Sequence, residues 1–297
     1  MKIYAMAKVN LGLDVLRRRE DGYHEVRMIM QTLKLHDELI INKRSDDKIG
    51  IDCNNENLEC DENNLIYRAA VLIMETAGIH TGLDIRLTKN IPIAAGMAGG
   101  STDAAATLVG LNHILELNYS NEKLKELGVR LGADVPYCIE GGTQLSEGIG
   151  EKLTKLCPAP RCIVLVAKPH ISVSTKYVYE NLHVDNIKKH PDIDSMLKAI
   201  EEGKLHDMAK CMENILENVT ESKYPVITDI KKTMLEYGAL NALMSGSGPT
   251  VFGLFEEEHK ARAALEALKK SNETSDLIIT EMSDDTAVVV HEDMGER

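Results

Sequence analysis

The sequence has few aromatic residues: among 297 residues there is no tryptophan and there are only two phenylalanines. An interior built on large aromatic side chains is therefore excluded, and Leu, Ile, Val, Ala and Met must fill it. An excess of positive charge is also absent, since 34 Lys and Arg face 47 Asp and Glu, a formal net charge of −13. Nucleic acid is thus disfavoured as the main partner, because binding its phosphates requires a basic surface.

Long apolar segments are missing as well. No hydrophobic run approaches the ~20 residues that span a bilayer, and the first twenty residues carry charges and lack the apolar core of a secretory signal. The six cysteines form no Cys-x-x-Cys pair and no metal-like group with histidine. These absences predict a cytoplasmic enzyme with free thiols that does not bind membranes.

The length and the pattern of segments predict an α+β protein of two domains. Hydrophobic residues make up 43% of the chain, and no repeat of solenoid length is present. The motif Cys-Pro-Ala-Pro at 157–160 interrupts the pattern with two prolines. We therefore expect an N-terminal domain over 1–156 and a C-terminal domain over 161–297.

Along residues 2–15, every second residue is an apolar one that belongs to a single face, and this period of two predicts a strand. Apolar side chains from Ile3 to Val15 occupy one face, whereas Lys8 and Asn10 project together from the other. Further strands are expected at 28–42, 83–87, 162–167, 250–255, 277–282 and 287–290, with a hairpin over 141–155. Helices are expected at 65–75, from about 101 to 115, and at 121–131, 175–182, 193–202, 205–216, 225–236 and 261–268, whereas 132–138 reads as a short loop into a turn.

A loop of small residues lies between the strand at 83–87 and the helix that starts near Ser101. From Ala94 to Gly100 every residue except Met97 is Gly or Ala. Such a loop lets several backbone N–H groups point at one anion, and the start of a helix adds a favourable dipole. Ser101 and Thr102 could cap the helix or contact a phosphate. The alternative is a tight turn with a hydroxyl cap. Neither a Walker A motif nor GxGxxG is present.

Other polar residues have an ordinary interpretation and a functional one. Lys8 alone could be a solvated strand lysine, and Asp134 could cap a helix before Val135. Tyr23 and His24 could be ordinary hairpin residues, or a surface that stacks on a base and reads its edge. A second glycine loop could be a turn into a strand or a close approach to a phosphate; it contains Ser245, Gly246, Ser247 and Gly248.

Taken in order, these segments resemble the GHMP kinases, the family named for galactokinase, homoserine kinase, mevalonate kinase and phosphomevalonate kinase. The shared motifs are Ala-Lys-Val-Asn-Leu at 7–11, the loop at 92–105, Gly-Ala-Asp-Val-Pro at 132–136 and Met-Ser-Gly-Ser-Gly-Pro-Thr at 244–250. Asp-Gly-Tyr-His at 21–24, together with the motifs at 7–11 and 132–137, makes the chain most similar to the branch that acts on 4-diphosphocytidyl-2-C-methyl-D-erythritol. The resemblance covers residues 2 to about 281.

One departure from the family concerns Ala94, Ala95 and Ala98, which stand where more glycine-rich loops carry Gly. A positive φ angle is costly for alanine, so we expect a slightly different loop shape here.

The resemblance implies that ATP and substrate bind in a cleft between two α+β domains. The γ-phosphoryl group of ATP would pass to the 2-hydroxyl of the methylerythritol unit, a step in non-mevalonate isoprenoid precursor synthesis. Asp134 would accept the hydroxyl proton, and Lys8 would hold that carboxylate and the migrating phosphoryl group. ATP, bound with Mg²⁺, would contact Pro92, Ile93, Ala94, Ala95, Gly96, Met97, Ala98, Gly99, Gly100, Ser101 and Thr102. Either hydroxyl of the last two would lie near the Mg²⁺, and Leu65 and Lys89 would line the adenine pocket.

By the same resemblance, Asn10, Tyr23 and His24 would hold the cytidine diphosphate, and Tyr179 would stack on the cytosine. The partner is then a small molecule, and the protein is expected to be a monomer or a weak homodimer. Two alternatives remain. A GHMP kinase for homoserine or a mevalonate-type acid would have no base for Tyr23 and His24 to read. A non-catalytic GHMP-fold protein would not need both Lys8 and Asp134.

Overall fold

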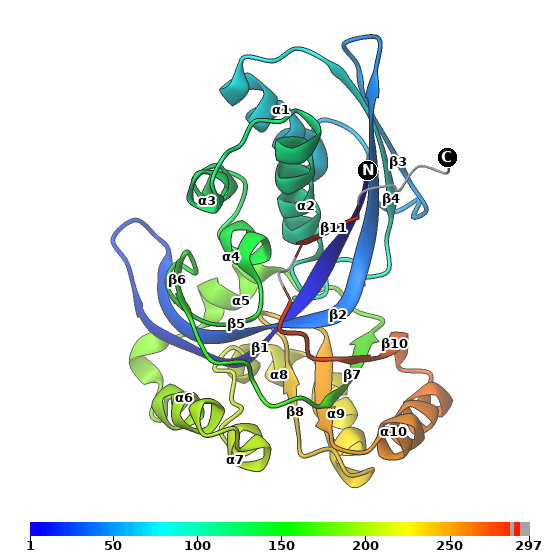
Figure 1. Cartoon of the computed structure of the whole chain (residues 1–297). Helices are drawn as coiled ribbons and strands as arrows, with labels where there is room; N and C mark the ends of the chain where they lie inside the picture. The colour runs from blue at the N-terminus through cyan, green and yellow to red at the C-terminus, as the bar shows by residue number, and fades with distance from the viewer. Residues whose placement is uncertain (286–287, 292–297) are drawn as a thin grey trace.

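The computed structural model describes residues 1–285 and 288–291, which form two sheets with helices packed against them (Figure 1). The first sheet has the order β11-β1-β2-β4-β3, and β5 joins it by pairing with β2 and with β6; the second has the order β10-β7-β9-β8. Its strands pair antiparallel, as do those of the first sheet except β3 and β4.

The strands are β1 Lys2–Arg18, β2 His24–Arg44, β3 Ile49–Cys53, β4 Gly82–Thr88, β5 Thr143–Gly148, β6 Lys152–Lys155, β7 Ile163–Pro169, β8 Asn241–Met244, β9 Val251–Phe255, β10 Thr274–Glu281 and β11 Val288–His291. The helices are α1 Leu65–Ala77, α2 Gly99–Ile114, α3 Asn121–Val129, α4 Val135–Glu140, α5 Thr175–Asn181, α6 Ile193–Glu201, α7 Leu205–Lys210, α8 Glu217–Lys223, α9 Val226–Glu236 and α10 Glu258–Ser271, with a 3-10 turn η1 Val184–Asn186.

Strand β1 contributes to the core of both halves of the molecule. Its predicted apolar face, from Ile3 to Val15, is buried. Bulges interrupt its pairing with β2, and the middle of this face packs with Val166 and Phe252 of the second sheet. The opposite face is covered too, since Lys8 is only 5% exposed. The interpretation of Lys8 as a solvated lysine is therefore wrong, because Asp134 and the loop around Gly96 cover that face.

Helices α1 and α2 pack side by side over the first sheet, and α9 and α10 pack over the second (Figure 1). Helix α1 begins as predicted, because the side chain of Asn64 accepts a hydrogen bond from the backbone N–H of Ile66 at 2.9 Å. Helix α2 lies so close to β1 that a Cβ on Gly110 would come within 2.1 Å of Ile3 Cδ1. The small residues of α2 thus permit the close contact between helix and sheet. The loop of small residues at 94–100, called the first glycine loop below, leads into this helix.

Two predicted segments differ from the structure. The expected helix at 205–216 stops at Lys210, because the chain there pairs with β1: Leu13 donates to the carbonyl of Glu213 and accepts from the N–H of Ile215, both at 3.0 Å. Helix α8 then starts at Glu217, which the sequence pattern did not indicate. The expected loop at 132–138 instead enters helix α4, with Pro136 in its first turn.

The chain returns to its first sheet at the end. Strand β11 pairs with β1, so residues 288–291 lie against the N-terminal half of the molecule. The motif at 157–160 falls between β6 and β7, which belong to different sheets; the division into 1–156 and 161–297 stays a prediction, and β11 departs from it. Ala287 of the expected last strand lies outside the described residues. Within residues 1–285 and 288–291, no helix combines the length and apolarity needed to cross a bilayer.

Candidate active site

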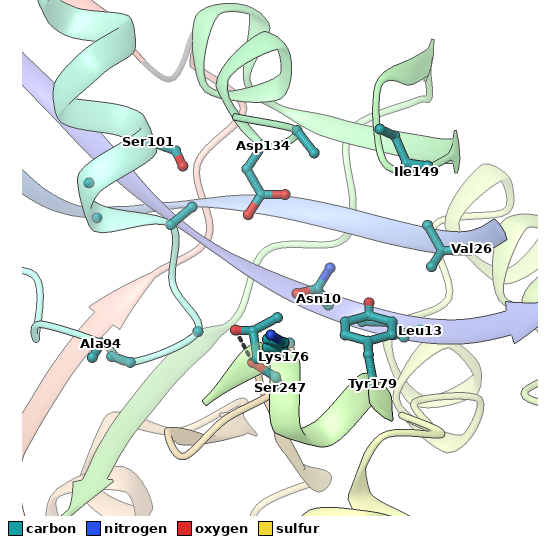
Figure 2. A pocket seen from close by; sticks show the side chains of 18 of the residues that line it. Asn10, Leu13, Val26, Ala94, Ser101, Asp134, Ile149, Lys176, Tyr179 and Ser247 are labelled. Carbon is teal, nitrogen blue, oxygen red and sulfur yellow. Dashed lines mark hydrogen bonds between the residues drawn. The ribbon is translucent and has the colours of Figure 1, made fainter. Parts of the chain in front are cut away.

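A cavity of about 1550 Å³ is lined by residues from both halves of the molecule (Figure 2). Its lining comes mainly from β1, β2, the segment at 57–65, the loop at 92–101, residues 133–134 before α4, α5, η1 and the second glycine loop. This volume exceeds the roughly 300–1,000 Å³ of a typical pocket for one ligand. The cavity therefore has room for a nucleotide and a second small molecule together.

Lys8 and Asp134 meet inside this cavity, although they come from separate elements. Lys8 Nζ lies 3.7 Å from Asp134 Oδ2, donates to Asn10 Oδ1 at 2.9 Å, and donates to the carbonyl of Gly96 at 3.4 Å. The Asn10 amide is itself fixed by a 3.2 Å contact with Met28 Sδ. The ammonium group is thus held in one place, between a carboxylate and the first glycine loop.

Asp134 occupies the N-cap position of α4, but its side chain makes no capping hydrogen bond. It points into the cavity instead (Figure 2) and is 33% exposed. The interpretation of this residue as an ordinary helix cap is therefore wrong. A carboxylate with open lone pairs beside a buried cation can accept a proton from a bound hydroxyl.

The first glycine loop keeps its tight shape despite the alanines. Ala94 and Ala98 have φ angles of 52° and 58°, which are left-handed values. The loop thus adopts positive φ angles at two of its alanines in spite of their cost, and a shape that differs from more glycine-rich loops stays a prediction. The surrounding contacts hold the loop: Lys8 N donates to the carbonyl of Met97, and a Cβ on Gly96 would come within 2.2 Å of the Ser245 carbonyl oxygen.

The two hydroxyls at the start of α2 lie in different surroundings. Ser101 lines the cavity and points toward it (Figure 2). Thr102 is fully buried, and its hydroxyl oxygen has no hydrogen-bond partner within the described chain. Only the Ser101 hydroxyl is therefore in a position to meet a phosphate or a phosphate-bound metal ion. Met97 is buried as well and does not contribute to the cavity lining.

The second glycine loop packs against the first. Ser245 Oγ donates to the carbonyl of Gly96 at 2.9 Å, so this carbonyl is shared with Lys8. Gly246 and Ser247 line the cavity, whereas Ser245 and Gly248 lie behind them. Asn214 supports the loop by donating to the carbonyls of Met244 and Gly246, both at 2.8 Å.

Aromatic side chains gather at the far end of the cavity. The rings of His24 and Tyr179 have centroids 5.1 Å apart, although they belong to β2 and α5. Burial, followed by the charge of Arg18, lowers the pKa of His24, so its imidazole is neutral at pH 7. Tyr23 also lines the cavity but is 60% exposed. These side chains offer flat surfaces and a neutral ring nitrogen.

Comparisons with known proteins agree on the family. The model for the GHMP kinases N terminal domain matches residues 64–142, and the model for GHMP kinases C terminal matches residues 196–274. A 4-diphosphocytidyl-2-C-methyl-D-erythritol kinase of Lachnoclostridium phytofermentans is 54% identical over 264 residues, which cover 89% of this chain and 91% of that protein. The chain belongs to the GHMP kinase family.

Solved structures of GHMP kinases share this fold. A crystal structure of 4-(cytidine 5'-diphospho)-2C-methyl-D-erythritol kinase superposes with a TM-score of 0.80 at 33% identity, covering 95% of this chain and 99% of that one. The homoserine kinase of Cytophaga hutchinsonii gives a TM-score of 0.77 at 21% identity, covering 97% and 96%. The latter likeness concerns the fold alone, so the backbone does not separate the branches of the family.

The predicted site residues of this GHMP kinase occupy one cavity, with the exceptions given above. Leu65 and Lys89 line it, but Lys89 is paired with two buried carboxylates, Asp37 and Asp103. Sequence reasoning missed both. Asp103 carried a signal, because it is a charged residue among the small apolar residues of α2; Asp37 carried none, since its strand pattern resembles that of its neighbours.

Proposed function

We propose that this GHMP kinase transfers the γ-phosphoryl group of ATP to the 2-hydroxyl of 4-diphosphocytidyl-2-C-methyl-D-erythritol. The observation that carries the proposal is the pairing of Lys8 with Asp134 in a cavity that also holds His24 and Tyr179. Curated relatives of that name are similar to nearly the whole chain. The non-catalytic alternative does not account for a cation held beside an open carboxylate.

In the proposed reaction, Asp134 orients the acceptor hydroxyl and receives its proton as the new P–O bond forms and the bond between the γ-phosphorus and the oxygen of the leaving ADP breaks. Lys8 stabilises that carboxylate and the negative charge on the migrating phosphoryl group. Phosphoryl transfer depends chiefly on positioning and charge stabilisation, which a cation fixed by Asn10 and Gly96 provides. The backbone N–H groups of the first glycine loop would hold the phosphates, helped by the α2 dipole.

Mg²⁺ would neutralise charge on the phosphates, and the residues of the cavity fit an ion held mostly by its ligand. The Ser101 hydroxyl faces the cavity, while the described residues contain no group of three His, Cys, Asp or Glu that could bind a metal by themselves. Mg²⁺ commonly keeps several waters and binds through substrate phosphates. Ser101 is therefore the residue we assign to its vicinity.

The cytidine would bind at the aromatic end of the cavity. A base between two rings needs about 7 Å, twice a van der Waals contact of ~3.5 Å, and the 5.1 Å between His24 and Tyr179 is too small. We infer that the base lies beside this ring pair and stacks on the exposed ring of Tyr23, with its edge turned toward His24. The neutral His24 imidazole would then accept from, or donate to, the edge of the base.

An acceptor screen tests the proposal. The purified protein is incubated with ATP, Mg²⁺ and, in turn, 4-diphosphocytidyl-2-C-methyl-D-erythritol, homoserine and mevalonate, and ADP release is measured. We expect release with the first alcohol. Faster release with homoserine or mevalonate would favour another branch of the family, and no release with any alcohol would favour the non-catalytic alternative.

A further inference from the structure

Three charged side chains are buried together beneath the first glycine loop. Lys89 Nζ donates to Asp103 Oδ2 at 2.9 Å and forms a second, shorter ion pair with Asp37 Oδ2. Exposure of all three side chains is 4% or less. Burying one cation with two carboxylates is expensive, so the arrangement calls for an explanation beyond stability.

The cluster closes the base of the loop. At the entry, Asp37 Oδ1 accepts from the backbone N–H groups of Asn90 and Ile91 at 2.6 and 2.8 Å. At the exit, Asp103 belongs to the second turn of α2. Lys89 joins the two, because one ammonium group binds both carboxylates. The loop that would bind the phosphates is thereby tied at both ends to one cation.

The cluster also lies very close to the loop backbone. A Cβ on Gly99 would come within 3.0 Å of Lys89 Nζ and 3.3 Å of Ile91 Cγ2. No positive φ is required at Gly99, so the close approach of Lys89 and Ile91 is what crowds a side chain there. Lys89 therefore lies directly under the residue whose N–H opens α2.

Lys89 is poorly suited to contact adenine. Two of its three N–H donors are used by carboxylates. Burial alone would lower the pKa of Lys89, but the carboxylates of Asp103 and Asp37 outweigh it and raise that pKa, so the cation persists. An adenine ring offers hydrogen-bond acceptors that such an occupied, fixed ammonium group cannot reach freely.

We propose that Lys89 is a positioning residue, which together with Asp37 and Asp103 holds the first glycine loop in the shape that binds the nucleotide phosphates. The inference rests on the proposed function in one respect, namely that nucleotide binds at this loop. It replaces the expectation that Lys89 lines the adenine pocket as a direct contact. Its consequence is that Lys89 governs affinity for phosphates and leaves affinity for the nucleoside unchanged.

Four variants test this: Lys89→Met, Asp103→Asn, the double variant Lys89→Met/Asp103→Asn, and Lys232→Met as the control, an exposed lysine on α9. Calorimetry gives the Kd values for ATP and ADP, and saturation-transfer NMR gives that for adenosine. We expect Lys89→Met to weaken ATP and ADP at least tenfold while adenosine changes less than twofold. Asp103→Asn keeps an oxygen acceptor for Lys89 and should stay within threefold of wild type.

Should Lys89→Met not fold, the double variant decides, because it removes the cation together with one carboxylate. Equal losses for ATP and adenosine would identify Lys89 as an adenine contact and overturn the inference. Unchanged ATP affinity in the double variant would overturn it as well. A wild-type protein that binds no ATP would instead contradict the proposed function.

Discussion

Replacing Asp134 with Asn should nearly abolish turnover while leaving the fold intact. The asparagine side chain has the same shape but cannot take the hydroxyl proton, and a general base typically contributes about 10²–10⁴-fold. The 3.7 Å separation from Lys8 Nζ is longer than a charge-assisted hydrogen bond of about 2.7–2.9 Å, so the carboxylate is free to engage a substrate. We therefore expect kcat to fall by two to four orders of magnitude.

Stability should change little, for two structural reasons. Asp134 makes no capping hydrogen bond, so the change removes none from α4. Lys8 also keeps Asn10 Oδ1 and the Gly96 carbonyl as acceptors. We expect the free energy of unfolding to stay within about 0.5 kcal/mol of wild type, the usual range for a substitution without a structural role.

The assay couples ADP release to a spectrophotometric signal, with ATP affinity measured separately by calorimetry. Glu140→Gln is the matched control, because this residue lies on the same helix, is 30% exposed and pairs with Lys125 outside the cavity. The control should retain wild-type kcat. Near-normal turnover in the Asn variant would refute the assignment of Asp134, and loss of ATP binding would point to a collapsed site instead.

Three further predictions concern residues of the site. Gly99→Val should weaken ATP binding at least tenfold, because the valine side chain would clash with Lys89. Thr102→Val should not weaken it, because the Thr102 hydroxyl makes no hydrogen bond. Equal ATP affinities of the two variants in calorimetry would mean that the loop is only a turn. Tyr23→Ala and His24→Ala should raise KM for the diphosphocytidyl alcohol and leave ATP affinity unchanged. In the wild-type protein, protonation of His24 below pH 6.5 should weaken binding of this alcohol. A KM that does not change with pH would speak against the reading of the base by His24. Ala98→Gly should raise the free energy of unfolding, measured in urea, by up to about 1 kcal/mol. The reason is that alanine pays about 1–2 kcal/mol for a left-handed φ and glycine does not. A lower free energy of unfolding would show that the loop is not strained at this residue.

The local elements could be predicted because their signals are local. The alternation along β1 reflects the two faces of a strand, and Asn64 supplies the cap of α1, so both were readable from neighbouring residues. The small residues of the first glycine loop likewise predicted that its backbone would lie close to a neighbouring group. The proximity of Lys8 and Asp134 could be predicted only from the resemblance to the GHMP kinases, because their spacing along the chain does not indicate it.

Long-range packing accounts for what could not be predicted. The face of β1 that carries Lys8 is buried by Asp134 and by the loop around Gly96, which lie far along the chain from it. The pairing of residues 213–215 with Leu13 ended the helix expected at 205–216. The loop that contains Ala94 and Ala98 is held by contacts of Gly96 with Ser245 and of Met97 with Lys8. In each case tertiary contacts outweighed the local preference.

The dependence of catalysis on the cytidine is the most direct test of the proposed function. The measurement is kcat/KM for 4-diphosphocytidyl-2-C-methyl-D-erythritol against that for the same alcohol without the cytidine, with ³¹P NMR of the product to locate the new phosphate. Stacking is worth roughly 1–3 kcal/mol per base, and a buried polar group left unpaired costs about 1–3 kcal/mol. We predict a ratio on the order of 10²–10⁴ and phosphate on the 2-hydroxyl. A ratio near one, or phosphate on another hydroxyl, would contradict the account.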